Sequence, residues 1–195
     1  MLEVKNLTLV RGGKKLFENL SFEVSSGQVF QLKGANGSGK SSLLQAIAGD
    51  IDPSDGEILI NGEKKILPKR LVRLLGYLPQ ELSVDFPITV LDYLRMAGSP
   101  SQINHFLSKF QLDDLFTKRI TELSLGQLQR VQFAQVMLQD PGIFLLDEPF
   151  SAQDRENTWL LMSVLGELKM KGKCVVLTNH IQMPMKDLID NELVI

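Results

Sequence analysis

Apolar and polar residues alternate in two stretches near the start of the chain, residues 2–10 and 16–24, on either side of Gly12 and Gly13. This period of two around a glycine turn predicts a pair of antiparallel strands. A further short strand, 57–60, lies between two turn-forming segments rich in proline, aspartate, asparagine and glycine. The beginning of the chain is therefore expected to form an antiparallel β-subdomain.

Four apolar runs then alternate with helix-like stretches, a pattern typical of a mainly parallel sheet in an α/β fold. These runs are residues 28–33, 74–78, 143–147 and 174–178. The pattern becomes helical after residue 80, with candidate helices at 88–97, 101–110 and 126–138 and with Ser101 as the cap of the second. We expect one domain, 1–195, in which a helical subdomain of approximately 81–138 is inserted into the core.

A glycine-rich segment, residues 34–42, follows the strand 28–33 directly and reads Gly-Ala-Asn-Gly-Ser-Gly-Lys-Ser-Ser. It matches the phosphate-binding pattern G-x-x-x-x-G-K-[ST] in full. Glycines allow backbone N–H groups to converge on phosphate oxygens, and the helix that starts here adds its positive end. The fold class is therefore α/β with a P-loop NTPase core, and a nucleotide phosphate together with Mg²⁺ is the expected ligand. The expected nucleotide-binding residues are Gly34, Ala35, Asn36, Gly37, Ser38, Gly39, Lys40, Ser41 and Ser42, with Lys40 on the β- and γ-phosphates and Ser41 on Mg²⁺.

Two acids, Asp147 and Glu148, end the apolar run that begins at Ile143. A buried parallel strand presents such residues at its carboxyl end, where ligands bind in α/β folds. Asp147 is expected to hold Mg²⁺, and Glu148 to orient an attacking water or accept its proton. The alternative is that the two acids lie in a solvated turn. The phosphate-binding segment upstream favours the metal-binding and catalytic roles over this alternative.

Between these sites, the segment Leu123-Ser124-Leu125-Gly126-Gln127 resembles the signature Leu-Ser-Gly-Gly-Gln of ATP-binding cassette (ABC) ATPases, with Leu125 in place of a glycine. The resemblance extends to Gln80, which matches the Q-loop, to residues 151–154, which match the D-loop, and to His180, which matches the switch histidine. Six motifs in the same order cover nearly the whole chain.

This resemblance implies that Ser124, Gly126 and Gln127 contact ATP bound to a second copy of the chain, in an ATP-dependent head-to-tail homodimer. It implies catalytic roles for Lys40, Gln80, Glu148 and His180, and Mg²⁺ ligation by Ser41, Gln80 and Asp147. Leu125 is expected to alter rate or affinity and not to abolish function. By themselves, Ser124 would be an ordinary helix cap and His180 a structural histidine.

The function implied is an ATP-binding and ATP-hydrolysing subunit that energises solute transport through a separate transmembrane permease. A soluble or regulatory ABC ATPase that uses ATP-driven dimerisation without transport is the alternative. Residues 84–90 resemble the cassettes of zinc and manganese importers, although an ordinary apolar link into a helix explains them equally well.

Recognition of the base is less defined, because Arg11 stands where the family usually has an aromatic residue. A guanidinium can also stack on a purine, so Arg11 is a candidate nucleotide-binding residue. A solvated turn arginine is an equal alternative, and the preference between ATP and GTP stays open.

Composition is consistent with one catalytic unit: 195 residues, 44% hydrophobic and 23% charged. The net charge of −2, with acids and bases interspersed, argues against a nucleic-acid-binding face. Cys174, the single cysteine, lies in an apolar run and is expected to be buried. The chain shows neither a signal-peptide pattern nor a long apolar run, so we expect it in the cytoplasm, peripheral on the cytoplasmic face of a membrane.

Overall fold

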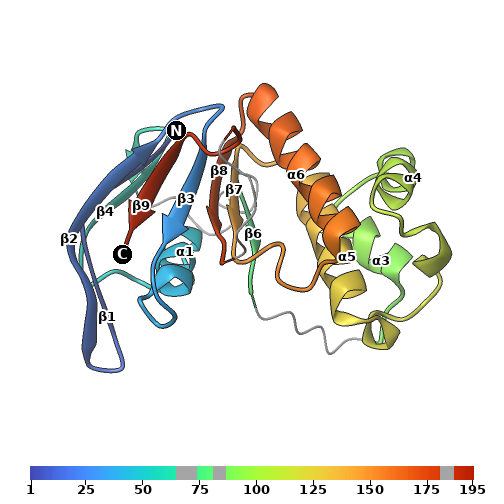
Figure 1. The fold of residues 1–195 in the computed structure, drawn as a ribbon, viewed down its shortest axis with the longest axis horizontal. Helices are drawn as coiled ribbons and strands as arrows, with labels where there is room; N and C mark the ends of the chain where they lie inside the picture. The colour runs from blue at the N-terminus through green and yellow to red at the C-terminus, as the bar shows by residue number, and fades with distance from the viewer. Residues whose placement is uncertain (65–73, 81–86, 181–186) are drawn as a thin grey trace.

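The computed structural model describes residues 1–64, 74–80, 87–180 and 187–195. The expected helical subdomain, which starts at about residue 81, therefore begins outside the described residues, as does the first part, residues 84–86, of the segment that resembles metal importers. The described part contains two sheets and a group of helices (Figure 1).

The antiparallel sheet has the order β2-β1-β4-β5, and the prediction of an N-terminal β-subdomain is confirmed. Its strands are β1 (Leu2–Arg11), β2 (Lys14–Val24), β4 (Asp55–Ile60) and β5 (Glu63–Lys64). Gly12 and Gly13 form the turn between β1 and β2 with φ of 58° and 76°, values that favour glycine. The two-residue strand β5 was not predicted, because it is too short to show a pattern.

The second sheet is parallel throughout, in the order β6-β7-β8-β3-β9. Its strands are β3 (Val29–Lys33), β6 (Leu75–Leu78), β7 (Ile143–Leu146), β8 (Cys174–Thr178) and β9 (Asn191–Val194). Four of them were predicted within one residue at each end. Sequence reasoning missed β9, since its four residues are largely exposed and only pairing with β3 defines it as a strand.

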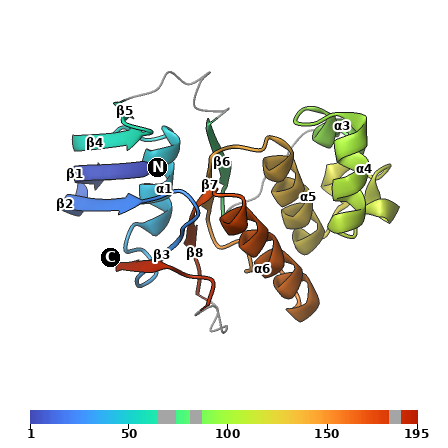
Figure 2. The same cartoon turned by 90° about the horizontal axis from the view of Figure 1, so that it is seen from above.

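Both faces of the parallel sheet are covered, and alternate residues of each strand point to different cores. Ile143, Leu145, Cys174 and Val176 pack with α1 (Lys40–Ala48) and the antiparallel sheet. Phe144, Leu146, Val175 and Leu177 pack with α5 (Leu125–Leu138) and α6 (Arg155–Met170). Figure 2 shows α1 on one side of this sheet, and α5 and α6 on the other. Cys174 is 1% exposed, as expected, and burial raises the pKa of its thiol to about 11.

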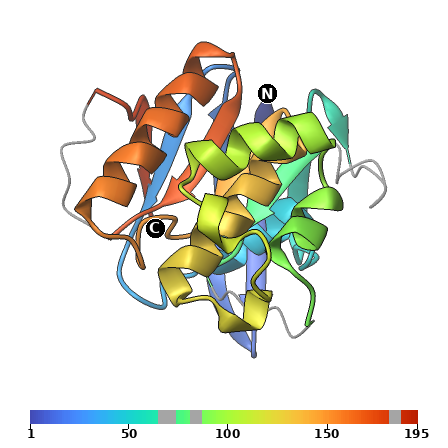
Figure 3. The same ribbon diagram turned by 90° about the vertical axis from the view of Figure 1, so that its right-hand side faces the viewer.

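The helical region also contains α3 (Val90–Arg95), α4 (Pro100–Lys109) and two 3₁₀ turns, η1 (Asp113–Leu115) and η2 (Ile120–Glu122). These elements cluster against α5 (Figure 3). Ser101 is not the cap of α4, so that prediction was wrong. Ser99 is the cap, because Pro100 suits the first helical position and the Ser99 N–H donates to Oε1 of Gln102 at 3.0 Å. In the described ranges, no helix is both long and apolar enough to cross a lipid bilayer.

Candidate nucleotide-binding and catalytic site

Adjacent parallel strands bring three functional segments to one edge of the sheet. Leu146 of β7 pairs with Leu177 of β8, and Thr178 at the end of β8 pairs with Leu32 of β3. The strands therefore end side by side, so the segments that follow them, which start at Gly34, Asp147 and Asn179, emerge at the same carboxyl edge.

The segment between β3 and α1 has the backbone of a phosphate-binding loop. Gly37 and Gly39 have φ of 78° and 108°, and Gly39 is the N-cap of α1. A Cβ atom at Gly39 would lie 2.6 Å from Cζ of Phe17, so the packing of the Phe17 ring also requires glycine there. Nζ of Lys40 donates to the carbonyl oxygens of Gly34 and Ala35 at 3.0 and 2.9 Å, which holds the ammonium group within the loop.

The two acids after β7 have different surroundings. Asp147 is 1% exposed, and its Oδ1 accepts a 2.7 Å hydrogen bond from Oγ1 of Thr178. The backbone N–H of Glu148 donates to the same hydroxyl at 2.8 Å. Oδ2 of Asp147 is buried without a hydrogen-bond partner among the described residues. Asp147 is thus a fixed carboxylate with one oxygen free to bind a ligand.

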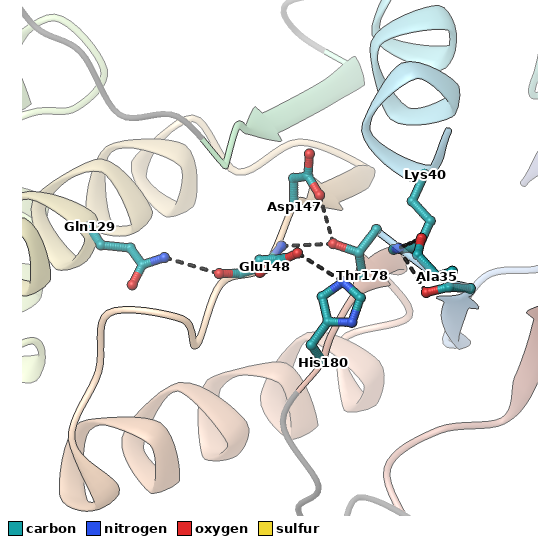
Figure 4. A network of polar contacts seen from close by, with 8 residues as sticks. Ala35, Lys40, Gln129, Asp147, Glu148, Thr178 and His180 are labelled. Carbon is teal, nitrogen blue, oxygen red and sulfur yellow. Dashed lines mark hydrogen bonds and ion pairs between the residues drawn. The ribbon is translucent and has the colours of Figure 1, made fainter. Parts of the chain in front are cut away.

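Glu148 points toward His180. Nε2 of His180 lies 3.1 Å from Oε1 of Glu148, and these side chains are 38% and 17% exposed (Figure 4). Glu148 has φ of 49°, in the left-handed region that few non-glycine residues occupy. The structure therefore brings together Lys40, Asp147, Glu148 and His180 around the ends of β3, β7 and β8.

The remaining residues predicted to bind nucleotide or Mg²⁺ within the same chain differ in how far they are exposed. Ser41 and Ser42 lie in the first turn of α1, partly and fully buried. Ala35, Asn36 and Gly37 form the exposed tip of the loop, whereas Ser38 Oγ is buried. Gln80 is exposed, two residues beyond the end of β6 at the same sheet edge.

Arg11, at the end of β1, contacts the phosphate-binding segment through α1. Its Nη1 donates to Oγ of Ser42 at 2.9 Å and to Oε1 of Gln45 at 3.0 Å. The guanidinium of this exposed residue is therefore held against the first turns of α1.

The Ser124 segment is not part of this cluster. Ser124 caps α5, accepting from the Gln127 N–H at 3.3 Å, while its own N–H donates to Oε1 of Gln127 at 3.0 Å. Within one chain, Ser124 thus makes the contacts of an ordinary helix cap, the alternative that its position alone suggested. Gly126 follows in the same first turn, and Leu125 is 60% exposed. Within one chain, this end of α5 lies well away from α1 and the phosphate-binding loop (Figure 1).

Sequence reasoning missed three polar residues that support the site. Thr178 is fully buried and joins Asp147 to the backbone of Glu148. Gln129 and Gln153 link α5 to the segment after β7. The position of Thr178 at the end of a predicted strand was a usable signal. Gln153 lies in the segment 151–154 that matches the D-loop, but no local pattern indicated the contacts of the two glutamines.

The site has the parts of an ATP-hydrolysing P-loop protein, and comparisons with known proteins define the class further. The sequence pattern of the family described as "ABC transporter" matches residues 17–151. The cytochrome c biogenesis ATP-binding export protein CcmA of Tatumella citrea is 36% identical over 188 residues, which cover 94% of this chain and 90% of that protein. The manganese transport system ATP-binding protein MntB of Bacillus subtilis is 31% identical over 204 residues, with coverage of 97% and 80%.

Solved structures agree with the sequence relatives. An ATP-binding subunit of an ABC transporter superposes with a TM-score of 0.91 at 28% identity, covering all of this chain and 85% of that one. A dimeric ATP-binding cassette in a post-hydrolysis state, bound to ADP and Pi, gives a TM-score of 0.82 at 26% identity, with coverage of 93% and 88%. The chain belongs to the ABC transporter family. It is an ATP-binding and ATP-hydrolysing subunit of the kind that energises transport through a separate membrane protein.

Proposed function

We propose that residues 1–195 act as one ATPase domain, with a helical subdomain of approximately 81–138, and that its complete active site forms between two copies. The main supporting observation is that, within one chain, the catalytic residues and the Ser124 segment lie apart. Lys40, Asp147, Glu148 and His180 gather at one sheet edge, whereas the Ser124 segment opens at the start of α5, away from them. A head-to-tail dimer would place the Ser124 segment of one copy over the nucleotide of the other.

In this arrangement the loop of residues 34–42 holds the ATP phosphates. The N–H groups at the start of α1 favour anionic oxygens, and the Nζ donors of Lys40 turn from the Gly34 and Ala35 carbonyls to the β- and γ-phosphates. Arg11 contributes a second positive charge near the loop through its contact with Ser42. From the partner copy, Ser124, Gly126 and Gln127 contact the γ-phosphate.

Glu148 orients the attacking water and accepts its proton, and His180 hydrogen-bonds the γ-phosphate. Nε2 of His180 lies 3.1 Å from Oε1 of Glu148, which supports the proposal that both side chains act at the same phosphate. Gln80, at the start of the segment leading to the helical region, contacts the metal ion or water and transmits the nucleotide state to a membrane partner.

The residues present fit Mg²⁺. Magnesium prefers oxygen ligands, and the buried Oδ2 of Asp147 has no hydrogen-bond partner in the described part of the chain. Asp147, the Ser41 hydroxyl and Gln80 would hold the ion together with ATP. When bound, Mg²⁺ neutralises negative charge on the phosphates.

The transport role places the subunit on the cytoplasmic face of a membrane, bound to a transmembrane permease. The two named relatives belong to different systems, one for cytochrome c biogenesis and one for manganese transport. Their names therefore support a transport function but assign no solute to this chain.

A mixed-dimer experiment tests the composite site. Lys40→Ala disables the loop of one chain, and Ser124→Arg disables the signature segment of the other. Each variant alone forms two defective sites, whereas a head-to-tail heterodimer has one site with both defects and one intact site. Mixing the two variants should restore ATP hydrolysis; a mixture no more active than the separate proteins would rule out the shared site.

The transport role is tested with the Glu148→Gln variant, which is expected to bind ATP and lose turnover by orders of magnitude. With ATP, this variant should retain a multi-span membrane protein from detergent-solubilised native membranes, and Lys40→Ala should not. Retention of ribosomes or DNA-associated proteins instead would favour a soluble ABC ATPase.

A further inference from the structure

A chain of side-chain hydrogen bonds joins the first turn of α5 to the backbone of Glu148. Nε2 of Gln153 donates to the carbonyl oxygen of Gly126 at 3.1 Å and to Oε1 of Gln129 at 2.8 Å. Nε2 of Gln129 then donates to the carbonyl oxygen of Glu148 at 3.1 Å (Figure 4). Gln129 is 1% exposed, so its two hydrogen bonds are shielded from water, whereas the Gln153 amide is only partly buried.

The bond from Gln129 reaches a backbone that needs external support. Glu148 has φ of 49°, and a non-glycine residue keeps such a conformation only where its surroundings enforce it. Thr178 binds the N–H of Glu148 from one side, and Gln129 binds its carbonyl from the other. The Ser151 N–H also donates to this carbonyl, at 3.2 Å, from within the same turn. Gln129 is therefore the α5 contact that orients the Glu148 peptide.

At the other end, the first turn of α5 fits closely against the segment that carries Gln153. A Cβ atom at Gly126 would lie 2.6 Å from the carbonyl oxygen of Ala152, so the two backbones are in direct contact. A shift of the Ser124 segment must then move residues 152–153 or break the bonds of Gln153.

We infer that Gln129 and Gln153 are positioning residues that align the Glu148 carboxylate only while the Ser124 segment of the same chain is in place. This rests on the proposed roles of Glu148 and Ser124. In the dimer, the Ser124 segment contacts the nucleotide of the partner, whereas Glu148 acts on the nucleotide of its own chain. The two glutamines thus link the occupancy of one site to the chemistry of the other.

The test uses Gln129→Met and Gln153→Leu, which remove the amide groups and keep similar volumes. Gln132→Leu is the matched control, since Gln132 lies one turn further along α5, is 7% exposed and has an Oε1 without a partner among the described residues. Both test variants should lower kcat roughly tenfold to a hundredfold, the effect of small misplacement of a catalytic group. KM for ATP should change less than about twofold, and the thermal midpoint should match the control.

A second measurement separates positioning from general damage. In a Glu148→Gln background the group to be aligned is gone, so Gln153→Leu should lower the residual rate no further. Equal kcat in the test and control variants, or rate losses that multiply with that of Glu148→Gln, would overturn the inference. If Gln129→Met does not fold, the same two measurements on Gln153→Leu still test the inference, because Gln153 is only half-buried. Full hydrolysis by Glu148→Gln itself would instead refute the proposed function.

Discussion

Oγ1 of Thr178 donates a 2.7 Å hydrogen bond to Oδ1 of Asp147, and both residues are almost fully buried. The threonine stands at the end of β8 and the aspartate directly after β7, so the bond ties two neighbouring strands at the edge where the site lies. It leaves the second oxygen of Asp147 available for a ligand.

Replacing Thr178 by valine keeps the shape and removes this bond. The buried carboxylate then loses a partner, and we expect a loss of roughly 1–3 kcal/mol in the free energy of unfolding. Hydrolysis should fall as well, because Asp147 and the Glu148 N–H both lose their common anchor. Denaturant titration and a steady-state ATPase assay measure the two effects.

Thr158→Val is the matched control, since the hydroxyl of Thr158, in the first turn of α6, donates at 2.7 Å to the carbonyl of the N-cap residue Asp154 and contacts none of the catalytic residues. It should reduce stability with little change in hydrolysis. Equal hydrolysis in the Thr178 and Thr158 variants would show that the Asp147 contact is only structural.

Removal of the Lys40 ammonium should weaken ATP binding itself. A charged hydrogen bond to phosphate contributes about 1.5–3 kcal/mol, so Lys40→Ala should raise the Kd for ATP roughly tenfold to a hundredfold. Lys33→Ala is the control, because Lys33 carries the same charge just before the loop and pairs with Glu192 at 2.6 Å on the surface. If both variants bound ATP equally well in a calorimetric titration, the phosphate-binding role of Lys40 would be wrong.

Arg11 should contribute to nucleotide affinity through its position on α1. Arg11→Ala is expected to weaken binding of both ATP and GTP by roughly 0.5–2 kcal/mol, a range typical of cation–π and charged contacts. Lys14, which pairs with Arg11 across the turn and is exposed, provides the control Lys14→Ala. Fluorescence titration with both nucleotides measures the effect, and identical affinities in the two variants would indicate a solvated arginine without a nucleotide contact.

Asp190 should make stability depend on acid pH. Burial alone would raise the pKa of its carboxyl group, but hydrogen bonds from Lys169 at 2.6 Å and from the Val29 N–H at 2.8 Å outweigh it and lower the pKa below the ordinary 3.8. Since the folded pKa is depressed, the stabilisation is fully present above the unfolded pKa and disappears as pH falls through the folded pKa.

Asp190→Asn should therefore cost roughly 1 kcal/mol in unfolding free energy near neutral pH and progressively less in acid. Denaturant titrations at a series of pH values, from neutral pH to the lowest pH at which the protein stays folded, provide the measurement. Asp114→Asn is the control, because Asp114 is exposed. A difference from wild type that stayed constant down to the lowest pH would contradict this assignment.

The sequence by itself determined the class of ligand, the fold and most strands, because these depend on local patterns. The spacing of Gly34, Gly39 and Lys40 requires a particular backbone, and continuous apolar runs such as Ile143–Leu146 favour a buried strand. Such signals lie within a few residues of one another, so they can be recognised without knowledge of distant contacts.

Only the tertiary structure decided which residues meet. The contact of Glu148 with His180, the support of Asp147 by Thr178 and the glutamine link to α5 all join residues from segments far apart in the chain. The strand β9 exists because β3 offers an unpaired edge, and its own four residues carry no strand pattern. Long-range pairing of strands sets these positions, and no local periodicity records it.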